Sequence, residues 1–373
     1  MPRPLADIIA GYRRTAPLTE ASTIPSEWYT DPRVLDVERR TVFSRAWQVT
    51  GRIDQLQRPG QYVTCETAAG EPIVLVRGSD NVLRGFFNVC RHHAAEVAAS
   101  PEGSVTHLRC PYHGWTYSLE GELKGTPDFA GVCDFDRASN GLVSVDIDVW
   151  DKWVFVRLTP DSSSLVQFLG SGLTGWFPGH DVADMRWMER RCYTVDCNWK
   201  VFVDNYLDGG YHVPQLHKGL DSVLDYSAYT IETGDRFCLQ SSPMVAGGAD
   251  TRTGAVRTGE RALYFWVYPN FMINCYSGAM DTNLVVPRGP DRTEVIFDFF
   301  FSDVSERARA RNLESMAISE QIQQEDVAIC ASVQRGLSSR AYSAGRLSVR
   351  REAGEHLFHQ LLHDDLTAGT GEP

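Results

Sequence analysis

The segments Cys90-Arg91-His92 and Cys110-Pro111-Tyr112-His113 each place one thiol and one imidazole in a short loop. Seventeen residues separate the two loops. Zinc sites with two cysteines and two histidines usually take like ligands from the same element, whereas here each loop offers one ligand of each kind. In a mixed-ligand two-iron cluster, two thiolates hold one iron and two imidazoles the other. The residue order therefore predicts a [2Fe-2S] cluster held by Cys90, His92, Cys110 and His113, with zinc as the alternative.

A second group of candidate ligands follows further along the chain. His212 and His217 are five residues apart, which on an uninterrupted helix would direct them about 140° from one another. Gly209-Gly210 and Pro214 disfavour an uninterrupted helix, and a break would allow both imidazoles to converge. Because histidine pairs are more often structural than metal-binding, this spacing needs a third ligand to indicate a metal site.

A helical pattern from about Ser305 to Arg335, ending at Gly336, offers that third ligand. Its apolar stripe is expected to consist of Ile322, Ile329 and Val333. At 100° per residue, Asp326 lies about 40° and Glu325 about 60° from the centre of this stripe. Two imidazoles and one carboxylate form the facial triad of non-haem Fe(II) enzymes. We therefore predict that His212, His217 and Asp326 bind a mononuclear iron, with Glu325 as the alternative carboxylate.

The composition excludes several classes of function. The 373 residues include 36 Lys and Arg and 48 Asp and Glu, so the formal charge is 36 − 48 = −12. This charge disfavours nucleic acid as a partner. No apolar run is long enough for a signal peptide or a membrane span, so we expect a cytoplasmic protein with no membrane association. Nine scattered cysteines indicate reduced thiols rather than a disulfide framework.

The pattern of the chain changes near Asp161-Ser162-Ser163-Ser164, which we interpret as a seam between domains. Before it, short runs between Gly, Asp and Asn residues predict antiparallel strands near residues 62–65, 73–76 and 153–156. After it, strand-like runs at 263–267 and 294–301 accompany the long helix. The sequence thus predicts an α+β fold: a mostly-β first half, and a second half with an antiparallel sheet and helices.

One further motif is set aside. Gly170-Ser171-Gly172-Leu173-Thr174-Gly175 matches the dinucleotide fingerprint G-x-G-x-x-G. Trp176-Phe177-Pro178-Gly179 follows where a helix should begin, and no βαβ pattern surrounds it. We therefore interpret the segment as a glycine-rich loop.

The two candidate sites resemble those of a known family. Cys90-x-His92 with Cys110-Pro-Tyr-His113-Gly-Trp115 resembles the cluster motif of Rieske oxygenase α subunits, and Asn205 to His217 resembles their mononuclear iron motif. Within that family, similarity to choline monooxygenases runs from about Trp28 to His363. The segments that carry it are Asp204–Pro214, Tyr268–Asn274, Met280–Pro287, Glu325–Val327 and Val333–Leu337.

The resemblance implies a domain order and partners. We expect an N-terminal arm at residues 1–45 that packs on the catalytic domain, a Rieske [2Fe-2S] domain at 46–160 and a helix-grip-like catalytic domain with the mononuclear iron at 161–373. It also implies a homotrimer. Electrons would come from a separate ferredoxin and/or flavin reductase, with NAD(P)H acting only through that reductase.

The resemblance also implies a monooxygenase that hydroxylates a small quaternary ammonium substrate such as choline, using O2 and two electrons. A trimethylammonium group needs aromatic faces, and Tyr264, Trp266 and Tyr268 share one face of the strand expected from Ala262 to Tyr268. An ordinary aromatic sheet core is the competing interpretation. The alternative functions are demethylation or ring hydroxylation of another small substrate, a Rieske electron carrier without an oxygenase site, and a zinc-stapled binding protein.

Two further residues of the iron motif are expected to act in catalysis, namely Asn205 and Asp208. Many Rieske oxygenases have an acid three residues before the first iron-ligating histidine, but Gly209 occupies that position here and Asp208 lies four before. Because metal-bound histidines usually donate their second N–H to a carboxylate, we predict that Asp208 connects His212 to a cluster histidine of a neighbouring subunit.

Overall fold

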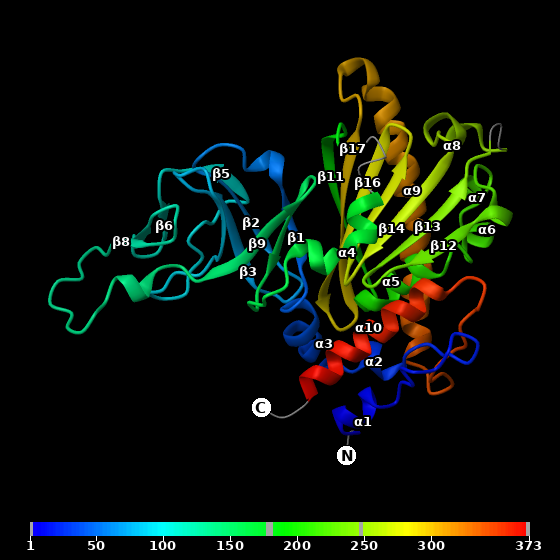
Figure 1. Ribbon diagram of the computed structural model, residues 1–373, viewed down its shortest axis with the longest axis horizontal. Coiled ribbons are helices and arrows are strands. Elements are labelled where there is room, and N and C mark those ends of the chain that lie inside the picture. The colour runs from blue at the N-terminus through cyan, green and yellow to red at the C-terminus, as the bar shows by residue number, and fades with distance from the viewer. Residues whose placement is uncertain (1–2, 177–181, 246–248, 371–373) are drawn as a thin grey trace. The chain divides into compact units, whose positions relative to one another are not determined.

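The computed structural model describes residues 3–176, 182–245 and 249–370 (Figure 1). The chain divides into two compact units, one comprising Phe43–Leu165 and the other Met1–Val42 with Val166–Pro373. Both units are built on antiparallel sheets, and helices gather in the second. This confirms the predicted α+β fold class. No helix within the described ranges is long and apolar enough to cross a membrane.

The unit Phe43–Leu165 is built on a seven-stranded antiparallel sheet. The strands predicted near residues 62–65, 73–76 and 153–156 are confirmed. β-branched and leucine side chains from Ile73 to Val76 are fully buried, as expected for an interior strand. The sheet order is β1 (Gln48–Arg52), β10 (Trp153–Arg157), β9 (Ser144–Trp150), β4 (Leu83–Phe87), β3 (Pro72–Arg77), β2 (Gln61–Glu66) and β5 (Glu102–Ser104).

A small three-stranded sheet in the same unit presents the cysteine loops. It consists of β6 (Leu108–Arg109), β7 (Thr116–Tyr117) and β8 (Leu123–Gly125). The turn between β6 and β7 carries Cys110 and His113, and the loop that follows β4 carries Cys90 and His92. The positive φ of 72° at Gly114 allows the tight turn between the two strands.

The second unit is built on another seven-stranded antiparallel sheet (Figure 1). Its order is β11 (Arg186–Val195), β17 (Arg292–Phe301), β16 (Ala279–Gly289), β15 (Phe271–Tyr276), β14 (Arg261–Val267), β13 (Phe237–Pro243) and β12 (Thr230–Thr233). The strands predicted at 263–267 and 294–301 are thus confirmed. Pairing aligns Tyr264 with Asn274 and Asn274 with Asp281, so a row of polar and aromatic side chains crosses three strands.

The long helix α9 (Glu306–Leu337) runs along this sheet and confirms the predicted helix (Figure 1). The prediction that Ile322, Ile329 and Val333 form its buried apolar stripe was wrong, because Ile329 and Val333 are 39% and 44% exposed. The buried face instead carries many polar side chains: Asn312, Ser315, Ser319, Gln323, Asp326 and Gln334. The face is polar because it meets polar residues of the sheet, as Ser319 does when it donates to Asp281.

The remaining helices of the described ranges are shorter. They are α1 (Leu5–Ile9), α2 (Glu27–Thr30), α3 (Pro32–Glu38), α4 (Leu165–Trp176), α5 (Trp199–Leu207), α6 (Val213–Leu216), α7 (Lys218–Asp221), α8 (Thr251–Val256) and α10 (Ala353–Thr370). The segment Gly170–Gly175 lies in α4, so the expectation of a loop was wrong. Buried Leu169 and Leu173 hold the segment in a helix that is interrupted at Gly170, where φ is 79°. Among the described residues no nucleotide-binding βαβ unit is formed, because the sheets are antiparallel.

The N-terminal segment is fastened to α5 by a buried ion pair. Lys200 Nζ donates to Glu38 Oε1 over 2.6 Å, and both side chains are fully buried. Trp199 Nε1 donates to the other carboxylate oxygen over 2.8 Å. Burial lowers the pKa of Lys200, which Glu38 opposes. The position of α5, which leads into the histidine segment, therefore depends on this pair.

We expect Glu38→Gln to lower the free energy of unfolding by about 3–5 kcal/mol, because it leaves a buried ammonium without its counter-charge. Glu27→Gln removes an exposed pair with Arg3 and should cost no more than about 1 kcal/mol. Urea unfolding followed by tryptophan fluorescence measures both. Equal losses in the two variants would contradict the anchoring role of Glu38, and Glu38→Gln combined with Lys200→Met should recover much of the loss.

Candidate functional site

The break after α5 brings the two histidines together. Asn198 begins α5 by accepting a hydrogen bond from Lys200 N, and Asp208 ends it. Gly209 and Gly210 then adopt φ values of 69° and 68°, which favour glycine. A Cβ atom on Gly209 would lie 2.1 Å from the carbonyl oxygen of Arg351. The predicted interruption is therefore present, and the rings of His212 and His217 lie 4.9 Å apart between centroids.

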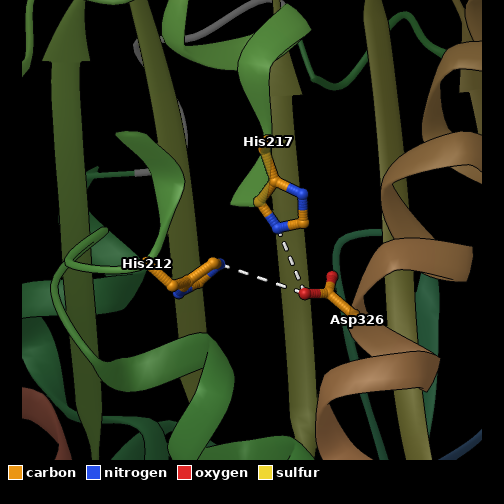
Figure 2. A group of neighbouring side chains, drawn as sticks. All are labelled: His212, His217 and Asp326. Carbon is orange, nitrogen blue, oxygen red and sulfur yellow. Dashed lines mark hydrogen bonds and ion pairs between the residues drawn. The ribbon is translucent and has the colours of Figure 1, made fainter. Parts of the chain in front are cut away.

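Asp326 reaches these imidazoles from α9, as Figure 2 shows. Its Oδ1 atom lies 3.1 Å from His217 Nε2 and 4.0 Å from His212 Nε2. One ligand atom from each of the three residues falls within 4.8 Å of the others. Asp326 is on the buried face of α9, although the apolar stripe from which its position was argued is not the buried face.

Carboxylates hold the outer nitrogen of each imidazole. Asp208 Oδ2 lies 2.6 Å from His212 Nδ1, and Glu325 Oε2 lies 2.6 Å from His217 Nδ1. This arrangement fixes both rings with Nε2 toward Asp326, as outer carboxylates do around metal-bound histidines. Glu325, the alternative ligand, thus contacts the side of His217 that faces away from Asp326.

Asn205 and the neighbouring charges complete the group. Asn205 Nδ2 donates to Asp326 Oδ1 over 2.9 Å. Burial opposes a proton on His217, but the hydrogen bonds that its imidazole donates to Asp326 and Glu325 outweigh burial and raise the pKa of His217. The buried acids thus favour a cation among them, which either a proton or a metal ion can supply. Two imidazole nitrogens and one carboxylate are a donor set that suits a non-haem iron.

A cavity opens beside this group, with about 750 Å³ of space free of protein atoms, part of it open to solvent. His212, His217 and Asp326 line it together with aromatic residues from α5 and the sheet. These aromatic residues are Phe202, Tyr206, Tyr229, Tyr264, Tyr276 and Phe297. Burial raises the pKa of Tyr264 well above its ordinary value, so this phenol stays neutral. The same cause raises the pKa values of Tyr206 and Tyr229.

The predicted aromatic strand supplies one of its three expected residues to the cavity. Tyr264 lines it, but Trp266 and Tyr268 do not. Trp266 is fully buried against Phe358 of α10, and the Tyr268 hydroxyl donates to Asp365. Period-two alternation placed the three residues on one face, but α10 covers part of that face. The expectation for Trp266 and Tyr268 as cavity residues was therefore wrong.

Several cavity residues were missed by the sequence analysis. Tyr206 comes from α5, Tyr229 from the connection before β12 and Tyr276 from β15, and only the fold brings them together. Arg257 and Asp281 are 4% and 5% exposed charged residues in the cavity wall. Asp281 belonged to a segment that resembled choline monooxygenases, which was the one available signal for it.

The two cysteine loops form a second group in the other unit. Cys90 and Cys110 are buried, and the Tyr117 hydroxyl lies 3.3 Å from Cys90 Sγ. The rings of His92 and His113 lie 4.6 Å apart between centroids. The structure therefore brings the four predicted donors together as two buried thiols and two adjacent imidazoles.

The cysteine loops fit an iron–sulfur cluster. His92 Nδ1 is buried without a hydrogen-bond partner among the described residues, which suits a nitrogen reserved for a metal. Burial, together with the neighbouring His93 and His113, lowers the pKa of His92, so its imidazole favours the neutral form that binds metals. Burial raises the pKa of Cys110, a cost that metal coordination of the thiolate offsets.

Comparison with known families matches both units. Residues 46–136 match the Rieske [2Fe-2S] domain. Residues 182–368 match the family described as the ring-hydroxylating α subunit, catalytic domain. The two matches cover the two groups of predicted metal ligands.

Named relatives cover almost the whole chain. It is 39% identical to choline monooxygenase, chloroplastic, of Arabidopsis thaliana, over 97% of this chain and 87% of that protein. It is 30% identical to the carnitine monooxygenase oxygenase subunit of Escherichia coli strain K12, over 92% of this chain and 93% of that protein. Both relatives are named as monooxygenases, one of choline and the other of carnitine. Choline and carnitine are both quaternary ammonium compounds.

Solved structures match over similar lengths. A quaternary ammonium Rieske monooxygenase in complex with L-carnitine is 27% identical, covers 98% of this chain and 99% of its own, and superposes with a TM-score of 0.81. Naphthalene 1,2-dioxygenase from Rhodococcus is 22% identical, covers 94% of this chain and 95% of its own, and shares the fold with a TM-score of 0.78.

We expect Asp326→Ala to abolish binding of the mononuclear iron, because Asp326 alone supplies a carboxylate between the two Nε2 atoms. Glu325→Ala should still bind iron at saturating Fe(II), but with an affinity for iron that is lower by about 10–100-fold. This variant loses only the hydrogen-bond partner of His217 Nδ1. Iron analysis combined with the visible spectrum measures both.

Cys90→Ser is the reverse control, which should lose the cluster absorption and keep the mononuclear iron. If Glu325→Ala loses the mononuclear iron and Asp326→Ala retains it fully, then Glu325 is the iron ligand and our assignment of Asp326 is wrong.

Proposed function

The chain belongs to the Rieske non-haem iron oxygenase family, and we propose that it hydroxylates a small quaternary ammonium compound such as choline. Its two domains imply a [2Fe-2S] cluster, a mononuclear iron and O2 as co-substrate. The iron supplies the oxygen chemistry, while the protein positions the substrate. The observation that carries the proposal is the wall of neutral tyrosines beside the convergent donors of His212, His217 and Asp326. A simple electron carrier is excluded, because residues 182–368 match a catalytic domain.

We assign ligands to each metal group. Cys90, His92, Cys110 and His113 would hold the cluster, and His212, His217 and Asp326 would hold the iron. The buried thiols and the unpartnered His92 nitrogen support the first assignment. The second is supported by the Nε2 atoms that face Asp326. Asn205 would keep Asp326 in position through its hydrogen bond to Oδ1.

The cavity wall supports a cationic substrate. Aromatic faces attract a quaternary ammonium group through the ring quadrupole, and they do so without a hydrogen bond that such a group cannot donate. The rings of Tyr264 and Tyr276 lie 6.1 Å apart between centroids and 80° from coplanar, so they form adjacent walls of the cavity. Their hydroxyl groups form a hydrogen bond of 3.0 Å with one another, which fixes the positions of the two rings relative to each other.

We expect choline to bind more tightly than 3,3-dimethylbutanol, in which carbon replaces the ammonium nitrogen. A desolvated cation on aromatic faces contributes about 2 kcal/mol, or roughly 30-fold in affinity. Calorimetry and product analysis with a surrogate reductase measure binding and turnover. Tyr264→Leu should reduce the preference for the cation, and Tyr264→Phe, which keeps the ring, should retain it. Equal binding of both compounds to the unaltered enzyme would refute a cationic substrate.

Partners and assembly follow from the same family. Rieske oxygenase α subunits need a redox partner and work as oligomers. We propose a separate ferredoxin and/or flavin reductase as that partner, and a homotrimer as the assembly. Asp208 would then connect His212 with a cluster histidine of the neighbouring subunit. Its 2.6 Å contact with His212 Nδ1 supports this role. Asp204, the other nearby acid, instead contacts Tyr29 and His359.

We expect Asp208→Asn to slow reoxidation of the reduced cluster by O2 and substrate in single-turnover experiments, because the carboxylate that fixes the His212 N–H is lost. Iron content and the trimer should be unchanged. Asp204→Asn is the matched control and should reoxidise normally. Normal reoxidation in Asp208→Asn, or a defect confined to Asp204→Asn, would remove Asp208 from the path.

A further inference from the structure

The wall of the cavity contains one buried charge of each sign besides the proposed iron ligands. Arg257 and Asp281 both line the cavity, and they are 4% and 5% exposed. The other acid among the described residues of this wall is Asp326, which we assign to the iron. Asp281 is therefore the carboxylate of the wall that is left to act on a substrate.

Arg257 and Asp281 are linked through one hydroxyl group. Arg257 Nη2 donates to Ser319 Oγ, and Ser319 Oγ donates to Asp281 Oδ2 over 3.3 Å. The directions of both bonds are fixed, because a guanidinium can only donate and an ionised carboxylate can only accept. A hydroxyl group has one hydrogen and two lone pairs, so it can make both bonds at once. The serine thus connects a buried cation to a buried anion.

Asp281 lies next to the tyrosines on the sheet. It pairs with Asn274 of β15, and Tyr276 follows Asn274 by two residues on the same face of that strand. Diagonal neighbours on adjacent strands lie about 7–8 Å apart. Asn274 in turn pairs with Tyr264 of β14. The carboxylate is therefore close enough to act electrostatically on a charge that lies beside the rings of Tyr264 and Tyr276.

Arg257 opposes the binding of a cation at the same rings. Its guanidinium carbon lies 4.5 Å from the centroid of the Tyr276 ring, so one cation already lies beside that ring. This charge would repel a substrate ammonium unless an anion compensated it, because charges interact strongly in a buried site of low dielectric constant. Burial raises the pKa of Asp281, and Arg257 opposes that rise, which favours the ionised carboxylate. Asp281 can therefore supply the compensating charge.

We propose that Asp281 determines the preference of the cavity for a cationic substrate, by neutralising Arg257 and supplying negative charge beside the tyrosine rings. The inference rests on the proposed function, in which those rings receive the ammonium group. The carboxylate acts through its electric field, so it needs no direct contact with the substrate. A neutral isostere of the substrate should therefore bind equally well whether residue 281 is charged or not.

Anaerobic calorimetry on the holoenzyme, with choline and 3,3-dimethylbutanol as ligands, tests this role. We expect Asp281→Asn to lower the affinity for choline by at least about tenfold, because it removes an attraction and leaves Arg257 without its counter-charge. The affinity for 3,3-dimethylbutanol should stay unchanged. Glu294→Gln is the matched control, since Glu294 belongs to the same sheet, pairs with Arg288 and does not line the cavity. This variant should change neither affinity.

Substitution of Arg257 separates an electrostatic role from a structural one. Arg257→Gln removes the opposing cation, so it should raise the affinity for choline and leave the affinity for 3,3-dimethylbutanol unchanged. The double variant Arg257→Gln with Asp281→Asn should bind choline more tightly than Asp281→Asn and less tightly than Arg257→Gln. Iron analysis and circular dichroism show whether each variant is folded and loaded. If Asp281→Asn alone does not fold, comparing the double variant with Arg257→Gln still isolates the charge of Asp281.

The role of Asp281 and the proposed function fail in different ways. Equal weakening of both ligands in Asp281→Asn, or weaker choline binding in Arg257→Gln, would overturn the role of Asp281. If the unaltered enzyme prefers choline and Asp281→Asn keeps the full preference, the cationic substrate stands and the role of Asp281 is wrong. If the unaltered enzyme binds 3,3-dimethylbutanol as tightly as choline, the cationic substrate class itself is wrong.

Discussion

The metal group depends on a chain reversal that only glycine permits. Asp326 is fixed on a long helix, and two imidazoles five residues apart must reach it from one segment. Gly209 and Gly210 provide the reversal, because both adopt positive φ and the first packs directly on the Arg351 carbonyl. A side chain at Gly209 would collide with that backbone atom. The break directs both Nε2 atoms to one point, and the carboxylates behind the rings keep them there.

The polar face of α9 is the second feature on which the site depends. A helix of this length usually buries an apolar stripe, but the buried face of α9 carries two serines, two glutamines, an asparagine and an aspartate. Such burial is costly unless each group has a partner. Arg257 bonds two of the serines, and Asn205 bonds Asp326.

Acids placed four residues apart have different roles. Asp208 contacts His212, whereas Asp204 accepts hydrogen bonds from Tyr29 and lies 3.0 Å from His359 of α10. Lys200, which pairs with the buried Glu38 of α3, lies on the same short helix. One side of α5 thus faces the metal group, and the other fastens the N-terminal segment and α10.

Local sequence predicted the donors that we propose for both metal groups. The mixed order of cysteine and histidine and the glycine pair before His212 could be identified from residue types and spacing, whereas Asp326 was selected from an apolar stripe that the structure does not bury. The main strands and the long helix could be predicted as well, because short β-branched runs and a helical repeat are local signals. Only the tertiary structure decided which aromatic residues face the cavity: α10 covers Trp266 and Tyr268, while Tyr206, Tyr229 and Tyr276 converge from separate elements. It also decided that α9 buries its polar face, since burial depends on the opposing surface, and no residue of a helix encodes what the sheet will present to it.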